Sequence, residues 1–413
     1  MNFRRLLILT DGMLNDGTGS GITLGNLFKG WLPDKLKVYS VQKDRGSTGL
    51  LSYKSCYIAH DNGPENRRNT VEATNNDQPR YLKSKLIKLL RPYLTPFLPV
   101  SINAETISEI IKYEPELIYS PVSDIYSIRR VQKIYKLSKA ELNIVIFDDL
   151  LNRYDDIPLA YFMKKLHMYY LKSVINSAKN VFACSEQMNE EYARIFNRKF
   201  YVVSNPVDLN KVNLATKNHS QVSGEFRIIY AGTINTKNIN SLIILANIIE
   251  KLSENGTGCS FNVLTFSAKF HEAKELFSKY KATSVRLTPT NDDELFRILA
   301  SASLLYLPID FSQESIKSIR LSYLTKQPLY MSLGVPLVVH GPRDVHIVQH
   351  ALENDYATVL VSERPKDLES IIIDHINSPE IARSKMNNGY RYAAQHHEIS
   401  IVQQNFYKKL LNE

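Results

Sequence analysis

The sequence has few cysteines and no long apolar run. Its three cysteines, Cys56, Cys184 and Cys259, are far apart and odd in number, which excludes a disulfide framework and a cysteine-based zinc site and favours a reducing compartment. No window of 18 apolar residues occurs, so no membrane-spanning helix is predicted. The apolar segment at residues 6–9 is too short for a signal peptide. We therefore expect a cytoplasmic protein, either free or attached at the inner face of the plasma membrane.

Basic residues outnumber acidic ones in a chain of otherwise ordinary composition. Lys and Arg number 51 and Asp and Glu 42, a formal net charge of +9. This balance favours a polyanionic partner such as nucleic acid, anionic lipid or a phosphorylated small molecule. No run of basic residues interleaved with aromatics is present, so nucleic acid is not expected. Hydrophobic residues at 44% and charged residues at 23% exclude a mainly disordered chain.

Short apolar runs alternate with helical patterns along the whole chain. Each run has four to six residues, and most are rich in β-branched or aromatic residues. Such runs predict buried parallel strands in βαβ units, and so an α/β fold. The expected strands are 6–10, 37–41, 117–121, 144–147, 180–184 and 201–204, followed by 227–231, 261–266, 285–289, 304–308, 337–340 and 358–361.

The best domain boundary follows Asn205-Pro206. Residues 214–224 are polar and lack an apolar period, which is typical of a linker. The chain then divides into two α/β halves with about six strands each. Residues 56–80 are polar and are expected to form a long loop.

A glycine-rich segment, Gly17-Thr-Gly-Ser-Gly21, follows the first expected strand. The apolar residues from Leu24 to Trp31 have helical spacing, which predicts a helix beginning near Gly21. A glycine turn before a helix exposes N–H groups and the positive end of the helix dipole. The segment matches neither the GxGxxG nor the Walker pattern. It is either a loop that contacts phosphate or sugar oxygens or a plain strand–helix turn.

Two adjacent carboxylates, Asp148 and Asp149, end the strand expected at 144–147. Two carboxylates facing each other raise one pKa, so one could act as a base or hold an acceptor hydroxyl. The structural alternative is that Asp149 caps a helix.

The second half repeats the arrangement of strand, glycine turn and lysine. Gly232 follows the strand at 227–231, and Lys237 precedes a helical pattern. This lysine could neutralise a phosphate, or it could be an ordinary solvated side chain.

The segment from Ser322 to Pro342 combines several helix signals. Pro328 suits a first helical turn, and Gly334 suits the position after the helix end. Thr325, Lys326 and the free N–H groups of that helix would form an anion cradle, which a departing pyrophosphate needs.

Two further patterns have an ordinary explanation. His346 and His350 are four residues apart, but no glutamate lies between them and one pair is a poor metal site. Residues 80–94 form a basic amphipathic pattern with Lys83, Lys85 and Lys88. That pattern fits either contact with an anionic membrane or a surface helix packed on its own core.

Together these segments resemble bacterial glycosyltransferases of the GT-B fold, in particular the retaining, family-4-like enzymes of surface-polysaccharide assembly, such as those of capsule or O-antigen. The resemblance rests on the glycine loop with Ile-Thr-Leu-Gly-Asn-Leu-Phe behind it, the Asp-Asp strand end, and Ser-x-x-Thr-Lys-x-Pro-x-Tyr-Met-x-x-Gly-x-Pro. Segments 181–188 and 203–208 are also similar, so the resemblance covers nearly the whole chain.

The resemblance implies two Rossmann-like domains with parallel sheets facing a central cleft. Residues 1–205 would bind the acceptor, residues 206–395 would bind the nucleotide-sugar, and a helix in residues 396–413 would cross back to the N-terminal domain. The implied reaction moves a sugar to a lipid-linked or polysaccharide acceptor with retention, and needs no cofactor or metal. The sequence contains no Asp-x-Asp triplet, which argues against the metal-using GT-A alternative.

The resemblance also implies roles for individual residues. Lys326 and Asp149 would be catalytic, with Asp149 and Asp148 on the acceptor side. The implied donor-binding residues are Gly19, Ser20, Gly21, Gly232, Lys237, Ser322, Thr325 and Lys326.

The sequence departs from the family at three positions. Leu321 and Leu329 stand where many relatives have two glutamates, and Thr233 stands where relatives often have arginine. Glu314 is the candidate substitute for a ribose-binding carboxylate. The departures keep open a non-catalytic, transferase-like partner subunit. A GT-B sugar-nucleotide epimerase or hydrolase is the other enzyme alternative.

Overall fold

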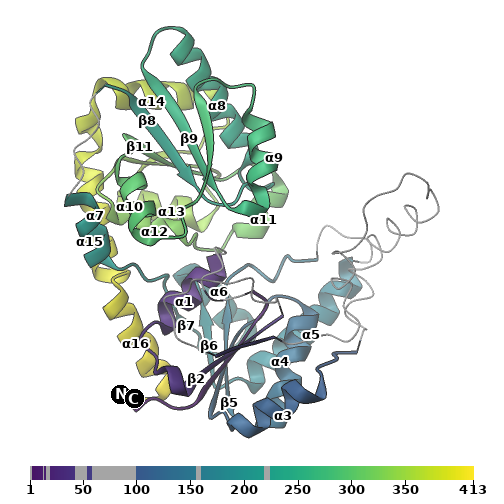
Figure 1. The fold of residues 1–413 in the computed structure, drawn as a ribbon. Helices are drawn as coiled ribbons and strands as arrows, with labels where there is room; N and C mark the ends of the chain where they lie inside the picture. Colours follow the sequence, from purple (N-terminus) through teal and green to yellow (C-terminus); the bar gives the residue numbers. More distant parts are fainter. Residues whose placement is uncertain are drawn as a thin grey trace, which may run out of the picture.

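The computed structural model consists of two α/β units stacked end to end (Figure 1). It describes residues 2–12, 14, 19–41, 54–57, 99–154, 160–217 and 224–413. A seven-stranded sheet forms the centre of the first unit and a six-stranded sheet that of the second. The chain returns from the second unit along helices α15 and α16, so both termini lie at the same end of the first unit (Figure 1).

All strand pairs in the first sheet are parallel, with the order β3-β2-β1-β4-β5-β6-β7. Its strands are β1 (Leu6–Thr10), β2 (Leu36–Ser40), β3 (Lys54–Tyr57), β4 (Leu117–Pro121), β5 (Glu141–Ile146), β6 (Asn180–Ala183) and β7 (Tyr201–Val202). The helices of this unit are α1 (Gly19–Phe28), α3 (Ala104–Tyr113), α4 (Ile125–Ser138), α5 (Ala160–Ser177) and α6 (Glu186–Phe196). Six strands were predicted near these positions, but β3 was missed because its four residues lack an apolar run.

The second sheet is also parallel, with the order β10-β9-β8-β11-β12-β13. Its strands are β8 (Phe226–Ala231), β9 (Cys259–Thr265), β10 (Thr283–Leu287), β11 (Leu304–Pro308), β12 (Leu337–His340) and β13 (Thr358–Leu360). Its helices are α8 (Ile239–Glu254), α9 (Ser267–Phe277), α10 (Asp292–Ala300), α11 (Gln313–Ile319), α12 (Lys326–Ser332), α13 (His346–Asn354), α14 (Pro365–Asn377) and α15 (Arg383–His396). All six strands predicted for this half are present, and β9 and β10 begin two residues early.

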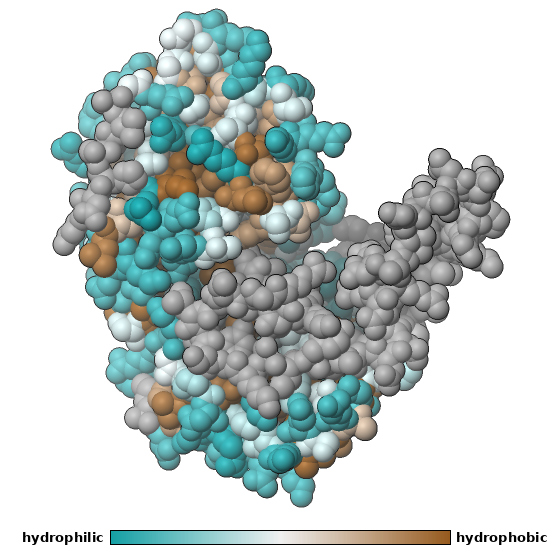
Figure 2. Space-filling model, in the orientation of Figure 1, coloured by the Kyte–Doolittle hydropathy of each residue, from teal (hydrophilic) through white to brown (hydrophobic). Residues whose placement is uncertain are grey.

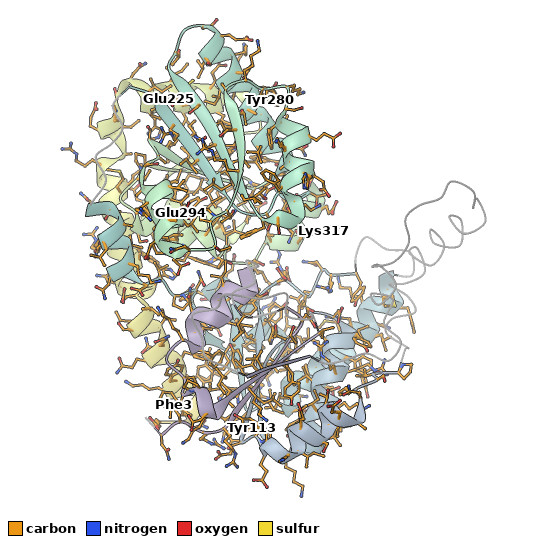
Figure 3. All side chains as sticks on the ribbon, in the orientation of Figure 1. Phe3, Tyr113, Glu225, Tyr280, Glu294 and Lys317 are labelled. Atoms are coloured by element: carbon orange, nitrogen blue, oxygen red, sulfur yellow. The ribbon has the colours of Figure 1, made fainter. Side chains whose placement is uncertain are left out.

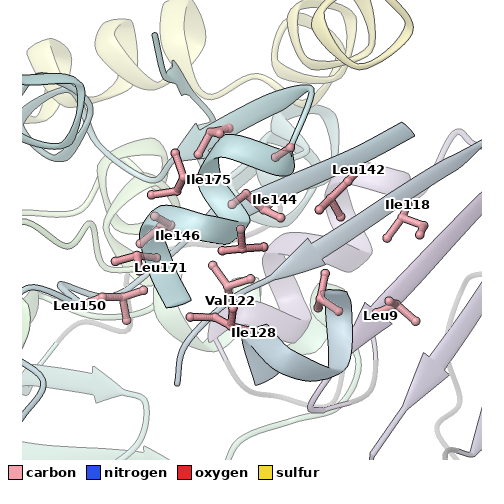
Figure 4. Packing of buried hydrophobic residues seen from close by; sticks show 14 of the residues in the cluster. Leu9, Ile118, Val122, Ile128, Leu142, Ile144, Ile146, Leu150, Leu171 and Ile175 are labelled. Carbon is pink, nitrogen blue, oxygen red and sulfur yellow. The ribbon is translucent and has the colours of Figure 1, made fainter. Parts of the chain in front are cut away.

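The central strands of both sheets are buried on both faces, which explains their continuous apolar runs. Every residue of β1 and of β11 is buried. On one face of the first sheet, Leu9, Ile118 and Ile144 pack against Ile128 of α4 and Leu171 of α5 (Figure 4). Buried apolar side chains on both faces stabilise a parallel sheet far more than strand propensity does.

Helix α7 (Leu209–Lys217) corrects the prediction of a linker at residues 214–224. Leu209, Val212 and Ala215 are buried and join the core of the second unit, and α7 packs against α10. The apolar residues of this helix begin before residue 214. The segment 214–224 contains only its polar end, so it was predicted to be a linker. The helix stops at Lys217, and residues 218–223 lie outside the described residues.

Helix α16 (Ile399–Leu411) packs on the first unit. Val402 and Phe406 join the core around β1 and α1. The Tyr407 hydroxyl donates to the Leu27 carbonyl at 2.7 Å, and the Gln403 amide donates to the Asn26 carbonyl at 2.8 Å. The chain thus enters α16 from the second unit, and α16 binds to the first unit through non-covalent contacts. Within the described residues, no helix is long and apolar enough to cross a membrane.

Candidate active site

The beginnings of α1 and α12 touch across the boundary between the two units. A Cβ on Gly19 would lie 2.6 Å from the Thr325 Oγ1, so only glycine allows this approach. Thr23 donates to Asn205 Oδ1 at 2.8 Å, and the Asn205 amide donates to the Thr325 carbonyl at 2.7 Å. The glycine segment predicted as a ligand loop therefore contacts the predicted anion cradle. The helix begins at Gly19, two residues before the predicted start.

Lys326 lies over the glycine turn that follows β8. Its Nζ donates to the Tyr230 hydroxyl at 2.9 Å and lies 4.1 Å from the centroid of the Tyr230 ring. A Cβ on Gly232 would overlap the Lys326 Nζ, and Gly232 has φ +151°. Two of the predicted donor-binding residues, Gly232 and Lys326, are thus in contact, and Thr325 of the same loop reaches Gly19.

No carboxylate of the described residues lies within ion-pair distance of the Lys326 amine. Among the described residues it forms no ion pair, and burial lowers its pKa to about 7. An ammonium held in a partly dehydrated place without a counter-ion is stabilised by an arriving anion. The arrangement can therefore bind a phosphate-bearing ligand and lose it again without breaking an internal ion pair.

Lys237 and Ser322 are placed differently from Lys326. Lys237 is half-buried; its N–H donates to Asn235 Oδ1 and its carbonyl accepts from the Asp310 N–H. Its side chain makes no ion pair with the described residues. Ser322 is only 4% exposed, and its Oγ has no hydrogen-bond partner in the described part of the chain.

Asp310 holds the start of α8 in place. The carboxylate is 2% exposed and accepts hydrogen bonds from the N–H groups of Asn240 and Ser241 and from the Ser241 hydroxyl. It thereby supplies the cap that Asn238 does not provide through its side chain. The sequence analysis overlooked Asp310, although its position two residues after a predicted strand was a usable signal.

The two adjacent carboxylates do not share one environment. Asp148 is exposed, whereas the Asp149 side chain is fully buried. Asp149 accepts from the Leu151 N–H, the Asn152 amide and the Arg320 guanidinium, each at 3.1 Å. Burial raises the pKa of Asp149, and the Leu151 N–H and Arg320 oppose that shift. The expectation that the two carboxylates face each other is therefore wrong, because a partner from the other unit draws Asp149 inward.

Arg320 connects the second unit to the first. It also binds Glu191 with two hydrogen bonds, at 2.7 and 2.8 Å, which raise the pKa of Arg320 and lower that of Glu191. Leu321, the next residue, is fully buried in the core of the first unit, and its carbonyl accepts from the Ser185 hydroxyl at 2.6 Å. The loop that carries Thr325 and Lys326 is thus anchored in the first unit. No sequence motif pointed to Arg320 or Glu191.

The structure locates the residues that depart from the family pattern. Leu321 fills the first core, and Leu329 packs against the second. Glu314 is exposed in the first turn of α11. Thr233 is exposed, and its carbonyl accepts from Tyr230 and Asn238.

The histidine pair is part of a buried aromatic cluster. The rings of His346 and His350 are 5.6 Å apart, and His350 hydrogen-bonds to the hydroxyls of Tyr392 and Tyr356 at 2.8 and 3.0 Å. In the part of the chain that the structure describes, no group of three His, Cys, Asp or Glu side chains is arranged to hold a metal ion.

A cavity of about 970 Å³ lies elsewhere, on the β8–β10 face of the second sheet. Figure 3 labels two of its lining residues, Glu225 and Glu294, and Figure 2, in the same orientation, shows an apolar patch on this side of the second unit. Arg227, Asn262 and Arg286 line it as well. None of the predicted site residues does, so this cavity is separate from the candidate active site.

Solved structures match the chain along almost its whole length. Sucrose-phosphate synthase from Thermosynechococcus elongatus has a TM-score of 0.65 at 12% identity, over 99% of this chain and all of that one. Anabaena HepE in complex with UDP has a TM-score of 0.61 at 12% identity with the same coverage. The chain has the GT-B fold. A glycosyltransferase from Rickettsia africae is also similar, with a TM-score of 0.59, 12% identity and coverage of 100% of this chain and 99% of that one.

No protein-family profile and no curated protein sequence matches the chain. At these identities the structural likeness establishes the GT-B fold and leaves the activity to be argued from the site.

Proposed function

We propose that this GT-B protein transfers a sugar from a nucleotide-sugar to an acceptor. One observation carries the proposal: the Lys326 amine lies over the Gly232 turn with no counter-ion among the residues that the structure describes. It is beside the contact between Thr325 and Gly19 of the other unit. A leaving nucleoside diphosphate develops negative charge on its β-phosphate. A cation and N–H donors at that point stabilise the charge more in the transition state than in the ground state.

The fold neighbours support this choice of donor. HepE was solved with UDP and with UDP-glucose, so these two compounds are the first probes to use. In our proposal residues 206–395 bind the donor, with Lys237 and Ser322 beside Lys326, while Ser20 and Gly21 contact it from the first unit. Residues 1–205 bind the acceptor near Asp148 and Asp149, and residues 396–413 complete that domain.

The finer proposal is transfer with retention of configuration and without a metal, to a lipid-linked or polysaccharide acceptor of a bacterial surface glycan. Same-face attack needs no free protein nucleophile, which agrees with the Asp149 carboxylate being bound by Arg320. The membrane contact proposed for residues 80–94 lies outside the described residues and stays a prediction.

A second candidate is a transferase-like subunit that binds nucleotide but does not catalyse transfer. Two observations favour it: Leu321 and Leu329 stand where many relatives have glutamates and are buried or half-buried, and the buried carboxylate of Asp149 is held in an ion pair between the units.

Thermal unfolding with nucleoside diphosphates and nucleotide-sugars, followed by a product assay, tests both candidates. A ligand at 100 times its Kd stabilises by about 2.7 kcal/mol. We expect a shift with UDP and UDP-glucose that Lys326→Ala removes and that Lys251→Ala, a change at an exposed lysine of α8, leaves intact. A thermal shift with nucleotide, but no transfer product with any acceptor tested, would favour the non-catalytic subunit. No shift with any nucleotide would contradict both.

A further inference from the structure

Helix α5 presents large aromatic side chains to solvent on the face opposite its core. Tyr161 is 73% exposed, Tyr169 is 69% exposed and Phe162 is 53% exposed. The inner face of the same helix is fully used, because Leu171 and Ile175 are buried against the first sheet (Figure 4). Tyr161 and Tyr169 lie on the outer side of the helix, away from this core, and their exposure needs another explanation.

The exposed aromatics form one stripe with lysines. Tyr161, Lys165, Tyr169 and Lys172 stand at intervals of four, four and three residues, which places them on one side of an α-helix. The stripe is about 17 Å long at 1.5 Å per residue. The Lys165 Nζ lies 4.4 Å from the Tyr161 ring centroid, so cation and ring lie side by side on the surface.

The charge along this segment has one sign. From residue 157 to residue 185 the sequence has no Asp or Glu, although the whole chain has 42. Helix stability does not account for this, because acidic residues are favoured in a first helical turn and α5 has none there. A face that binds a negatively charged surface does account for it.

We propose that the α5 face, formed by Tyr161, Lys165, Tyr169 and Lys172, docks on the surface of an anionic lipid bilayer. Tyrosine rings settle at the level of the lipid headgroups, and lysines on the same stripe attract anionic headgroups. A straight stripe on one helix suits a flat surface.

This inference rests on the proposed function, because it uses the proposal that the acceptor is linked to a lipid. A lipid-linked acceptor resides in a membrane, and α5 follows the segment that carries Asp148 and Asp149 at the end of β5. The docking face thus begins at the edge of the first sheet where we propose that the acceptor binds.

Flotation of the full chain with vesicles tests the α5 face. We expect binding to phosphatidylcholine vesicles that contain phosphatidylglycerol and at least fivefold weaker binding to pure phosphatidylcholine. The double variants Tyr161→Ser/Tyr169→Ser and Lys165→Gln/Lys172→Gln should each weaken binding at least fivefold. Only the loss caused by the lysine pair should shrink in high salt, because salt screens charge and not apolar contact.

Matched controls lie on the second unit. Lys251→Gln/Lys274→Gln changes exposed lysines of α8 and α9, and Leu352→Ser removes an exposed apolar side chain of α13. Neither should alter vesicle binding. Tyr169→Trp adds a second signal: its fluorescence should move to shorter wavelength on anionic vesicles, while Trp31 is already buried.

Several outcomes would overturn the inference. They are absence of binding to anionic vesicles, equal binding by wild type and both α5 variants, or loss of binding only in Lys83→Glu/Lys85→Glu/Lys88→Glu, which would assign the contact to residues 80–94. Nucleotide-induced thermal shifts are measured in parallel. Vesicle binding without nucleotide binding would contradict the proposed function and leave the α5 face standing; nucleotide binding without vesicle binding would do the reverse.

Discussion

The Arg320 guanidinium of the second unit donates at 3.1 Å to the fully buried carboxylate of Asp149 in the first unit. The same guanidinium holds Glu191 with two more hydrogen bonds. Five residues along the chain, the loop reaches Thr325 and then Lys326. The position of the Lys326 amine relative to the first unit therefore depends on an ion pair between the units.

Arg320→Ala should destabilise the protein by about 3 kcal/mol, because it leaves a buried carboxylate without its charged partner. Glu191→Gln should cost only about 1 kcal/mol, since Glu191 stays partly exposed and keeps a hydrogen-bonding side chain. Urea unfolding measures both. Equal losses of unfolding free energy in the two variants would mean that the contact with buried Asp149 stabilises the protein no more than the contact with Glu191.

Lys326→Ala should lower transfer by about 10²-fold or more, because the departing diphosphate loses its nearest cation. Single-turnover rates at saturating nucleotide-sugar measure the effect, with Lys251→Ala as the control. Unchanged transfer in Lys326→Ala would show that the phosphate site is assigned to the wrong place.

Nucleotide affinity should fall as the pH rises above about 7. The pKa of Lys326 is lowered to about 7 by burial, so the free protein loses the ammonium that binds phosphate in that range. Lys326→Arg keeps its charge at every accessible pH and should flatten the dependence between pH 7 and 9. Calorimetric titration with UDP at pH 6.5, 7.5 and 8.5 makes the comparison; parallel pH profiles for the two proteins would exclude Lys326 as the titrating group.

Gly19→Ala should weaken the contact between the units, because its Cβ would meet Thr325 Oγ1 at 2.6 Å. Thr325→Ala removes that atom and should rescue the variant. A double-mutant cycle by urea unfolding should give a coupling free energy of about 1 kcal/mol or more. Additive effects would show that the two residues do not touch in solution.

Stability should fall as the pH drops from about 6.5 to 4. His397 is 3% exposed; its Nδ1 donates to the Asn205 carbonyl, so its Nε2 accepts from the Tyr323 hydroxyl. Burial lowers its pKa to about 4, and the unfolded chain therefore takes up the proton first. His397→Gln should reduce the difference between urea midpoints at pH 7.5 and pH 5. It should not abolish the difference, because the pKa values of His346 and His350 are lowered too.

Much of the architecture was predictable because it depends on local pattern. Parallel strands covered on both faces need continuous apolar runs, and β1, β4 and β11 coincide with the predicted 6–10, 117–121 and 304–308. Gly334 has φ +65° just after α12, as predicted for a helix end. The resemblance to GT-B glycosyltransferases implied that the glycine segment, Thr325, Lys326 and Gly232 bind one donor, and the structure brings these residues together.

Pairings between distant segments were decided by the tertiary structure alone. Asp149 and Arg320 are 171 positions apart, and no pattern around either residue indicates the other. Leu321 enters the core of the first unit although its neighbours belong to the second. Strand β3 forms on β2 without an apolar run of its own. Local sequence determines which segments bury apolar surface. A buried charge or an open strand edge finds its partner only when folding brings distant segments together.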